Sequence, residues 1–248
     1  MSHKSEKVTH HRFEDAKRPQ VEYMFNAIAS QYDSLNSWLS FGLDKRWRKR
    51  ALRKIKNYPV GHMLDIAIGT GDSAILAYDM LQPEKITGVD ISDGMMDVGR
   101  KKVKKAGLED VISFQNEDCA SMTFPDGNFD SVITIFGVRN FENIENCFEE
   151  ILRVLKPGGV FMFLELTTPR YQPIKFFYNI YSKSFIPFIT HLLTKDKSSH
   201  GYLPQSIKAF PLGREMMKIL EKIGFSDIKK WSVTMGVCTI FVARKAEE

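Results

Sequence analysis

The residues Met63-Leu64-Asp65-Ile66-Ala67-Ile68-Gly69-Thr70-Gly71-Asp72 (63–72) form the stretch that decides the fold. A short apolar run reaches Ile66, and a turn bracketed by Gly69 and Gly71 follows before helical periodicity begins at Asp72. Glycine serves where the backbone takes unusual dihedral angles or where a ligand approaches it closely. The pattern therefore predicts a strand, a tight loop and a helix, with a nucleotide-like ligand at the loop.

The charges around this loop indicate which nucleotide it binds. Asp72 stands at the start of the predicted helix, where a carboxylate caps the helix but repels a pyrophosphate. Ala67 and Asp72 also interrupt the G-x-G-x-x-G spacing of dinucleotide-binding proteins. S-adenosylmethionine has no phosphate, and nearby carboxylates such as Asp65 and Asp72 would attract its cationic sulfonium. We therefore expect S-adenosylmethionine as the cofactor, bound by Asp65, Gly69 and Gly71.

Two further carboxylates follow apolar runs. Asp90 ends residues 86–90, about 20 residues after the glycine loop, where doubly wound sheets hold the acid that binds ribose hydroxyls. Asp118 follows residues 111–114 and suits an adenine amino group. Each acid alone is more often a helix cap or a solvated loop residue. Three consecutive strand ends in this order favour one cofactor site.

Length and composition indicate an ordinary globular protein. The 248 residues, 43% hydrophobic and 26% charged, suit one large α/β domain that spans 1–248 with a mobile segment 1–18. No apolar stretch has the length of a membrane span and the N-terminus has no apolar signal core, so we expect a cytoplasmic protein. The 3 cysteines and 6 histidines have no ligand spacing, so we assign no metal.

Strand and helix patterns alternate from residue 62 onward. Strands are expected at 62–66, 85–90, 111–115, 129–136, 160–166, 225–233 and 237–244, and helices at 72–81, 93–106, 144–155 and 213–223. This order predicts an α/β fold with a doubly wound, mostly parallel seven-stranded sheet and an antiparallel terminal hairpin. Helical periodicity from residue 19 to 41 adds N-terminal helices. Residues 169–211, rich in aromatics, predict a helical insert on the substrate side, before the last two strands.

Basic residues are concentrated in two runs, at 45–56 and 100–105, within a chain of net charge +5. Such runs are most often solvated helix faces, and otherwise meet nucleic acid or anionic lipid. The aromatic segment 171–193 favours lipid, so we expect peripheral contact with an anionic membrane surface, on its inner face, and no nucleic acid. The oligomeric state stays open, a homodimer included.

Several motifs resemble those of known enzymes. Leu64 to Asp72, Gly88-Val89-Asp90-Ile91-Ser92 and Leu155-Lys156-Pro157-Gly158-Gly159 resemble class I S-adenosylmethionine-dependent methyltransferases. Met24-Phe25-Asn26-Ala27-Ile28-Ala29 with Tyr32-Asp33, Ser40-Phe41-Gly42-Leu43 with Trp47, Phe136-Gly137-Val138-Arg139-Asn140, and Tyr202-Leu203-Pro204-Gln205-Ser206-Ile207 resemble the C-methyltransferases of menaquinone and ubiquinone biosynthesis. The resemblance spans about residue 20 to the C-terminus.

This resemblance implies cofactor contacts at Thr70, Asp90, Asp118 and Cys119. It also implies methyl transfer to a ring carbon of a polyprenylated quinol, and overall likeness favours demethylmenaquinone. The chain departs from the family pattern in two places. Ile135 replaces a common serine before the Phe-Gly of the fourth strand, and His200 replaces a common tyrosine.

Methylation of a quinol carbon requires a base or a group that stabilises the phenolate. Arg139 is the first candidate because a guanidinium lowers the proton affinity of a phenol, although a salt bridge with Glu142 or Glu165 is nearly as good an explanation. Asp33, Tyr32 and His200 are further candidates for proton transfer or orientation. Three alternatives remain: methylation of a benzoquinol, an O- or N-methyltransferase, and a non-enzymatic scaffold that binds the cofactor.

Overall fold

The computed structural model describes residues 4, 17–193, 201–211 and 213–247 of the chain. The helices are α1 (Lys17–Ile28), α2 (Tyr32–Ser40), α3 (Leu43–Leu52), α4 (Asp72–Leu81), α5 (Asp93–Ala106), α6 (Ile144–Val154), α7 (Ile174–Ile180), α8 (Ile186–Leu193), α9 (Tyr202–Ala209) and α10 (Arg214–Ile223). The strands are β1 (His62–Ile66), β2 (Lys85–Asp90), β3 (Ile112–Asn116), β4 (Phe129–Ile135), β5 (Leu155–Leu166), β6 (Ser226–Val233) and β7 (Cys238–Arg244).

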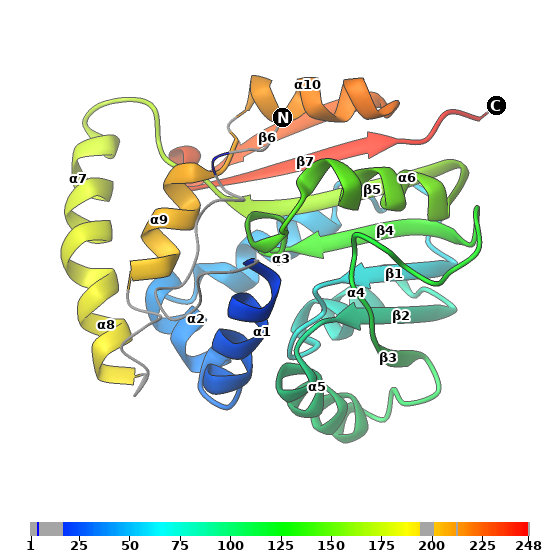
Figure 1. Cartoon of the computed structure of the whole chain (residues 1–248), viewed down its shortest axis with the longest axis horizontal. Coiled ribbons are helices and arrows are strands. Elements are labelled where there is room, and N and C mark those ends of the chain that lie inside the picture. Colours follow the sequence, from blue (N-terminus) through cyan, green and yellow to red (C-terminus); the bar gives the residue numbers. More distant parts are fainter. Residues whose placement is uncertain (1–3, 5–16, 194–200, 212, 248) are drawn as a thin grey trace.

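These strands form one seven-stranded sheet in the order β3-β2-β1-β4-β5-β7-β6 (Figure 1). The pairs among β3, β2, β1, β4 and β5 are parallel, whereas β7 runs antiparallel to both β5 and β6. The predicted fold class, with its antiparallel terminal hairpin, is therefore confirmed. Strand order reverses between β1 and β4, so the carboxyl ends of β1, β2 and β4 meet where open α/β sheets place their ligands.

Helices cover both faces of the sheet, and the alternation of side chains along the strands gives each face its own core. Leu64 and Ile66 face α6 and α10, in a core that includes Phe148 and Phe161. On the other side, Met63 belongs to the core beneath α3, α4 and α5. Strands β1, β2, β4 and β5 thus place apolar side chains in both cores, as a sheet between two helical layers requires.

Most boundaries of the strands and of the helices packed on them agree with the sequence prediction to within one residue, and the starts of β5 and α1 differ by more. Strand β5 begins at Leu155 rather than 160, because Leu155 pairs with Phe129 and a register shift between Phe129 and Ser131 accommodates the Lys156–Gly159 segment. Helix α1 begins at Lys17, before Pro19, so residues 17 and 18 are not part of a mobile end. The remaining residues of the expected mobile segment, apart from Lys4, lie outside the described part of the chain.

The insert between β5 and β6 is helical, as predicted. Helix α7 continues through a π-helical segment, Tyr181–Phe185, into α8, and together they stand at the left edge of the molecule in Figure 1. Helix α8 packs on α2 through a small core that includes Leu35, Leu39, Ile186 and Ile189. Within the described residues no helix is both long and apolar enough to cross a membrane.

Gly88 in β2 is a position where the fold excludes a side chain. A Cβ there would lie 2.0 Å from Cδ1 of Ile68 and 3.0 Å from its Cβ. We therefore expect Gly88→Ala to lower the free energy of unfolding by about 1–3 kcal/mol, the usual cost of overpacking a core. Urea denaturation of the purified variant measures this change.

A second variant checks the cause. Ile68→Val removes the Cδ1 atom, so the double variant Ile68→Val/Gly88→Ala should lose less stability than the sum of the two single losses. Strict additivity would mean that the clash with Ile68 is not what makes glycine necessary at position 88.

Candidate active site

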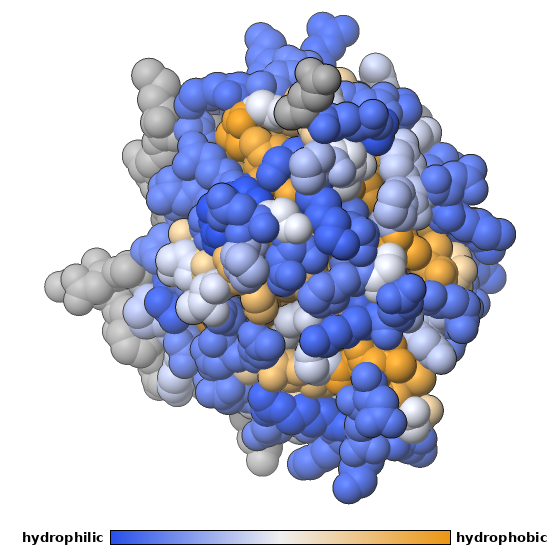
Figure 2. Space-filling view, turned by 90° about the vertical axis from the view of Figure 1, so that its right-hand side faces the viewer, coloured by the Kyte–Doolittle hydropathy of each residue, from blue (hydrophilic) through white to orange (hydrophobic). Residues whose placement is uncertain are grey.

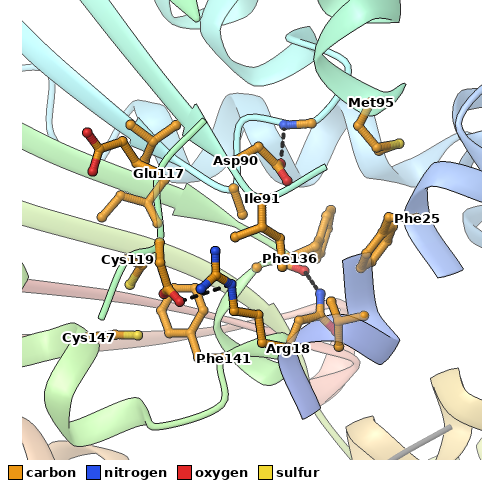
Figure 3. Close-up of a pocket in the computed structure, with 18 of the residues that line it drawn as sticks. Arg18, Phe25, Asp90, Ile91, Met95, Glu117, Cys119, Phe136, Phe141 and Cys147 are labelled. Atoms are coloured by element: carbon orange, nitrogen blue, oxygen red, sulfur yellow. Dashed lines mark hydrogen bonds and ion pairs between the residues drawn. The ribbon is translucent and has the colours of Figure 1, made fainter. Parts of the chain in front are cut away.

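The loop after β1 and the end of β2 build the base of a pocket. The two strands pair in parallel register up to Ile66 and Val89, which brings the glycine loop beside Asp90. Asp90 Oδ2 accepts a hydrogen bond from the backbone N–H of Gly69 (2.8 Å; Figure 3), and its Oδ1 accepts one from that of Ser92 (2.9 Å). Burial outweighs these bonds and raises the pKa of Asp90 to about 6, so the carboxyl is ionised at neutral pH.

This first pocket has about 770 Å³ of free space that opens to solvent. Its lining is mostly apolar and includes the acids Asp90, Glu117 and Asp118 together with Cys119. Figure 3 labels Asp90, Glu117 and Cys119 among the residues around the pocket. Gly69 lies at its base, where a Cβ would come within 3.2 Å of Met95 Cε. The pocket can therefore hold a flat apolar group together with hydroxyl and amino donors.

Helix α1 closes the pocket from the other side. Arg18 reaches across it to form an ion pair with Asp118 (Nε to Oδ2, 3.2 Å), and Phe25 lines it from the same helix (Figure 3). Asn26 Oδ1 accepts bonds from Ser92 Oγ (2.8 Å) and from the backbone N–H of Gly94 (2.9 Å). Sequence analysis did not find Arg18 as a site residue, because no local pattern connects a helix start to a loop 100 residues later.

The buried ammonium group of Lys17 attaches α1 to the loop after β4. Its Nζ donates to the carbonyl oxygens of Arg139 (2.8 Å) and Phe141 (3.0 Å). The backbone N–H of Lys17 donates to Glu142 Oε1 (3.1 Å). Glu142, one of the two salt-bridge partners considered for Arg139, therefore holds the start of α1.

The structure separates the predicted cofactor residues into two groups. Gly69, Asp90, Asp118 and Cys119 all line the first pocket. Three others lie outside its lining: Asp65, Thr70 and Gly71. Gly71 has a left-handed φ of +76°, and a Cβ on it would come within 3.4 Å of the Phe114 ring. The backbone conformation and the packing against Phe114 therefore explain why this position is a glycine.

The expectation that Asp65 and Asp72 supply negative charge to the cofactor is not met. Burial raises the pKa of Asp65 to about 8, so its carboxyl is mostly protonated at neutral pH. Asp72 does not cap α4, whose N-cap is Gly71, and forms an ion pair with Lys102 instead (2.5 Å). Neither group presents a free carboxylate to the pocket.

A second pocket, with about 550 Å³ of free space, lies between α2, α3 and the α7–α9 insert. Phe136 lines both pockets, in a left-handed conformation with φ of +63°. The rest of its lining includes Trp47, Arg139, Tyr178 and Tyr181. The two pockets are therefore neighbours that share Phe136, and the second is largely apolar apart from a few polar side chains.

Arg139 is the main cation of the second pocket. Its Nη1 lies 2.6 Å from Glu165 Oε1 and donates to the carbonyl of Phe136 (2.6 Å). Its Nε is buried without a hydrogen-bond partner among the described residues. Burial alone would lower the pKa of Arg139, but the Glu165 carboxylate and nearby Tyr32 raise it overall, so the guanidinium stays charged.

The other predicted catalytic residues lie at different places. Tyr32 lines the first pocket and packs edge-on against Phe25, with ring centroids 5.8 Å apart. Asp33 Oδ1 accepts a bond from Thr70 Oγ1 (2.6 Å), and its Oδ2 pairs with Lys102 Nζ (2.5 Å). Ile135, which replaces the common serine, lines the first pocket. His200 lies outside the described residues.

In the part of the chain that the structure describes, no three His, Cys, Asp or Glu side chains come together as metal ligands. The three cysteines, Cys119, Cys147 and Cys238, are free and buried. Cys147 belongs to a hydrophobic core and also lines the first pocket with Cys119 (Figure 3).

Comparison with protein families relates this geometry to known proteins. The model of the ubiE/COQ5 methyltransferase family matches residues 13–245. The chain belongs to the ubiE/COQ5 methyltransferase family. It is 47% identical to the demethylmenaquinone methyltransferase of Bacteroides fragilis over 245 residues, which cover 99% of this chain and 100% of that protein. It is 38% identical to the ubiquinone/menaquinone biosynthesis C-methyltransferase UbiE of Geobacter sulfurreducens, with 98% and 94% covered.

Solved structures confirm the fold of this ubiE/COQ5 methyltransferase. The 4+2 cyclase SpnF has a TM-score of 0.71 at 17% identity, with 93% of this chain and 97% of that chain covered. Phosphoethanolamine N-methyltransferase 2 of Haemonchus contortus, in complex with S-adenosyl-L-methionine, has a TM-score of 0.65 at 18% identity and covers 91% of this chain and 60% of that chain. At such identities the likeness concerns the fold alone.

The methyl donor of this ubiE/COQ5 methyltransferase is S-adenosylmethionine, and the first pocket fits it. Each Asp90 oxygen that accepts a backbone N–H keeps a further lone pair for a ribose hydroxyl. The bare Gly69 backbone admits close approach, and the apolar lining from Phe25, Ile91 and Phe141 suits an adenine ring. The free space of about 770 Å³ lies within the range of small-molecule sites.

Proposed function

We propose that the protein is a demethylmenaquinone methyltransferase, which methylates a ring carbon of a polyprenylated naphthoquinol in menaquinone biosynthesis. The names of the relatives at 47% and 39% identity support this substrate. The observation that carries the proposal is the second pocket, because it is largely apolar, contains Arg139 and adjoins the cofactor pocket at Phe136. A quinol ring bound there would lie next to the methyl donor.

The proposed chemistry joins two opposite charges. Bound S-adenosylmethionine supplies an electrophilic methyl group on a sulfonium. The protein lowers the barrier by holding the quinol as its phenolate in a pocket that solvates charge weakly, since both charges disappear as the carbon–methyl bond forms. The ring carbon then loses its proton and aromaticity returns. Closure by α1 and α7 aligns the reacting atoms through proximity.

Arg139 is proposed to stabilise the phenolate and to hold a water that accepts the quinol proton. Arg139 lines the second pocket, and its buried Nε has no hydrogen-bond partner among the described residues, whereas Glu165 and the Phe136 carbonyl hold its Nη1. A guanidinium group held by these two partners keeps a fixed orientation. Tyr32, which contributes to the charge environment of Arg139, is proposed to orient the quinol.

The remaining predicted residues receive supporting roles. We assign the ribose hydroxyls to Asp90 and the adenine edge to Asp118 and Cys119. Asp33 and Thr70 are proposed to fix the glycine loop through their mutual hydrogen bond, since Asp33 lies outside the lining of both pockets. Asp65, Gly69 and Gly71 shape the same loop.

We also propose where the enzyme works. A polyprenylated quinol dissolves in membranes, so the chain would act as one methyltransferase domain in the cytoplasm, at the inner face of the membrane. Helices α7, α8 and α9 of the insert 169–211 contribute to the lining of the second pocket, and the insert is proposed as its substrate side.

The proposed function is tested by methylation in vitro. Reduced demethylmenaquinone and a polyprenyl-methoxy-benzoquinol of equal prenyl length are each incubated with the protein and S-adenosylmethionine, and the product mass is measured. We expect a gain of one methyl on the naphthoquinol, at a carbon. Faster turnover of the benzoquinol would reassign the enzyme to ubiquinone biosynthesis, and a methyl ether product would make it an O-methyltransferase.

A further inference from the structure

An exposed aromatic surface extends over α7, α8 and the end of α2. It consists of six large side chains that are each 50–69% exposed: Trp38, Phe41, Phe176, Phe177, Ile180 and Phe188. We call these six residues the aromatic face. Monomeric proteins seldom expose so many large apolar groups together, and such a patch marks an interaction site.

The two parts of the aromatic face are joined by ring contacts. Phe41, at the end of α2, stacks on Phe185 of the π-helical segment with centroids 5.0 Å apart, and its ring lies 6.2 Å from that of Tyr181. Phe176 and Phe177 are in edge contact on α7, at 5.7 Å. The exposed rings thus belong to one surface, and Figure 1 shows α7 and α8, which carry most of these residues, at the left edge of the molecule.

Charge around this surface has one sign. Residues 167–193 contain three basic residues, Arg170, Lys175 and Lys183, and no acidic residue. Lys45 and Arg46, four and five residues after Phe41, are exposed, whereas the intervening Asp44 is buried. Figure 2 views the far side of the molecule from α7, and that face is mainly hydrophilic with only smaller apolar patches. Aromatic rings flanked by cations match the interface of an anionic bilayer.

The reverse side of the same helix lines the second pocket. Tyr178, Tyr181 and Ile186 point into that pocket, while Phe177 and Ile180 are exposed. The wall between the pocket and the aromatic face is therefore one helix thick. A π-helical segment in this wall adds a local irregularity of the kind that occurs at functional sites.

We propose that the aromatic face docks on an anionic phospholipid bilayer, with α7 and α8 lying along the headgroup region and the second pocket directly behind them. The proposal rests on the proposed function for its purpose, since the quinol would pass from the bilayer to the pocket along this wall. Docking itself needs no substrate, so it can be measured separately.

The test uses the full chain and sedimentation with two kinds of vesicle, phosphatidylglycerol mixed with phosphatidylcholine and phosphatidylcholine alone. We expect binding to the anionic vesicles that weakens as salt is added. Phe176→Ser/Phe177→Ser should weaken it roughly tenfold or more, because two rings no longer enter the interface. Tyr23→Ser, which removes an exposed ring from α1, is the matched control and should leave binding unchanged.

A second pair of variants tests the cations at equal net charge. Lys175→Glu/Lys183→Glu should weaken binding to anionic vesicles far more than Lys101→Glu/Lys104→Glu, which makes the same change on α5. The assignment of the aromatic face would be overturned if both lysine pairs weakened vesicle binding equally. It would also be overturned if Tyr23→Ser weakened binding as much as Phe176→Ser/Phe177→Ser. Absence of vesicle binding in a protein that methylates a detergent-dissolved quinol would overturn the docking proposal and leave the proposed function intact.

Discussion

Asp90→Ala should weaken S-adenosylmethionine binding by about 10²–10⁴-fold. Two charge-assisted hydrogen bonds to ribose are lost, each of about 1.5–3 kcal/mol. The substitution also removes the acceptor for the backbone N–H groups of Gly69 and Ser92, which position the glycine loop. Isothermal titration calorimetry measures the affinity, and Asp97→Ala on the exposed side of α5 is a control at equal charge. Unchanged affinity in a folded Asp90→Ala protein would mean that the ribose acid is misassigned.

The same carboxyl predicts how binding depends on pH. Burial raises the pKa of Asp90 to about 6 in the free protein, and only the ionised form accepts both hydroxyl protons. Affinity should therefore be constant above about pH 7 and fall as the pH drops below 6, by about tenfold per unit until the pKa of the complex is reached. Asp90→Asn should bind weakly and lose this pH dependence.

Arg139→Ala should lower turnover by about 10²–10³-fold while S-adenosylmethionine affinity stays near the wild-type value. A fall in turnover of this size is typical when an enzyme loses one group that stabilises negative charge on the reacting molecule, here the phenolate of the quinol. Arg139→Lys should recover little, because an ammonium does not reproduce the planar fork. Higher pH should partly restore turnover to Arg139→Ala by ionising the quinol without the protein's help.

The salt bridge with Glu165 requires a control for stability. Glu165 is fully buried, so Arg139→Ala leaves an unpaired charge in the core and should lower the free energy of unfolding by about 3–5 kcal/mol. The double variant Arg139→Met/Glu165→Gln removes both charges and should regain most of that stability. If it also regains turnover, Arg139 is a structural residue; if turnover stays low, Arg139 acts on the quinol.

The parallel half of the fold could be read from sequence with little error. The bounds of β1, α4, β2 and α5 agree with the prediction to the residue. In this part the spacing of apolar residues changes between the strand and the helix pattern at turns that contain glycine or aspartate. These turn residues mark the boundaries in the sequence. Residues 155–159 were less predictable, because their strand assignment depends on pairing with Phe129 across a register shift.

The site was predictable where it depends on topology. Gly69, Asp90 and Asp118 follow consecutive parallel strands, and the carboxyl ends of such strands share one edge. The contacts that α1 makes were not predictable, since those of Lys17 and Arg18 join residues 100 or more positions apart. The second pocket was missed for the same reason, because Trp47, Phe136 and Tyr178 meet only in the folded chain.

Helix α1 begins with two neighbouring residues that hold different loops. Lys17 binds the carbonyls of Arg139 and Phe141, and Arg18 pairs with Asp118. A shift of this first turn acts on the cofactor loop and the Arg139 loop together. Thermodynamic linkage makes such an effect reciprocal. The factor by which the first ligand changes the affinity for the second equals the factor by which the second changes the affinity for the first. If cofactor binding moves the first turn of α1, the affinity for the quinol should therefore change with it, by the same factor in both directions.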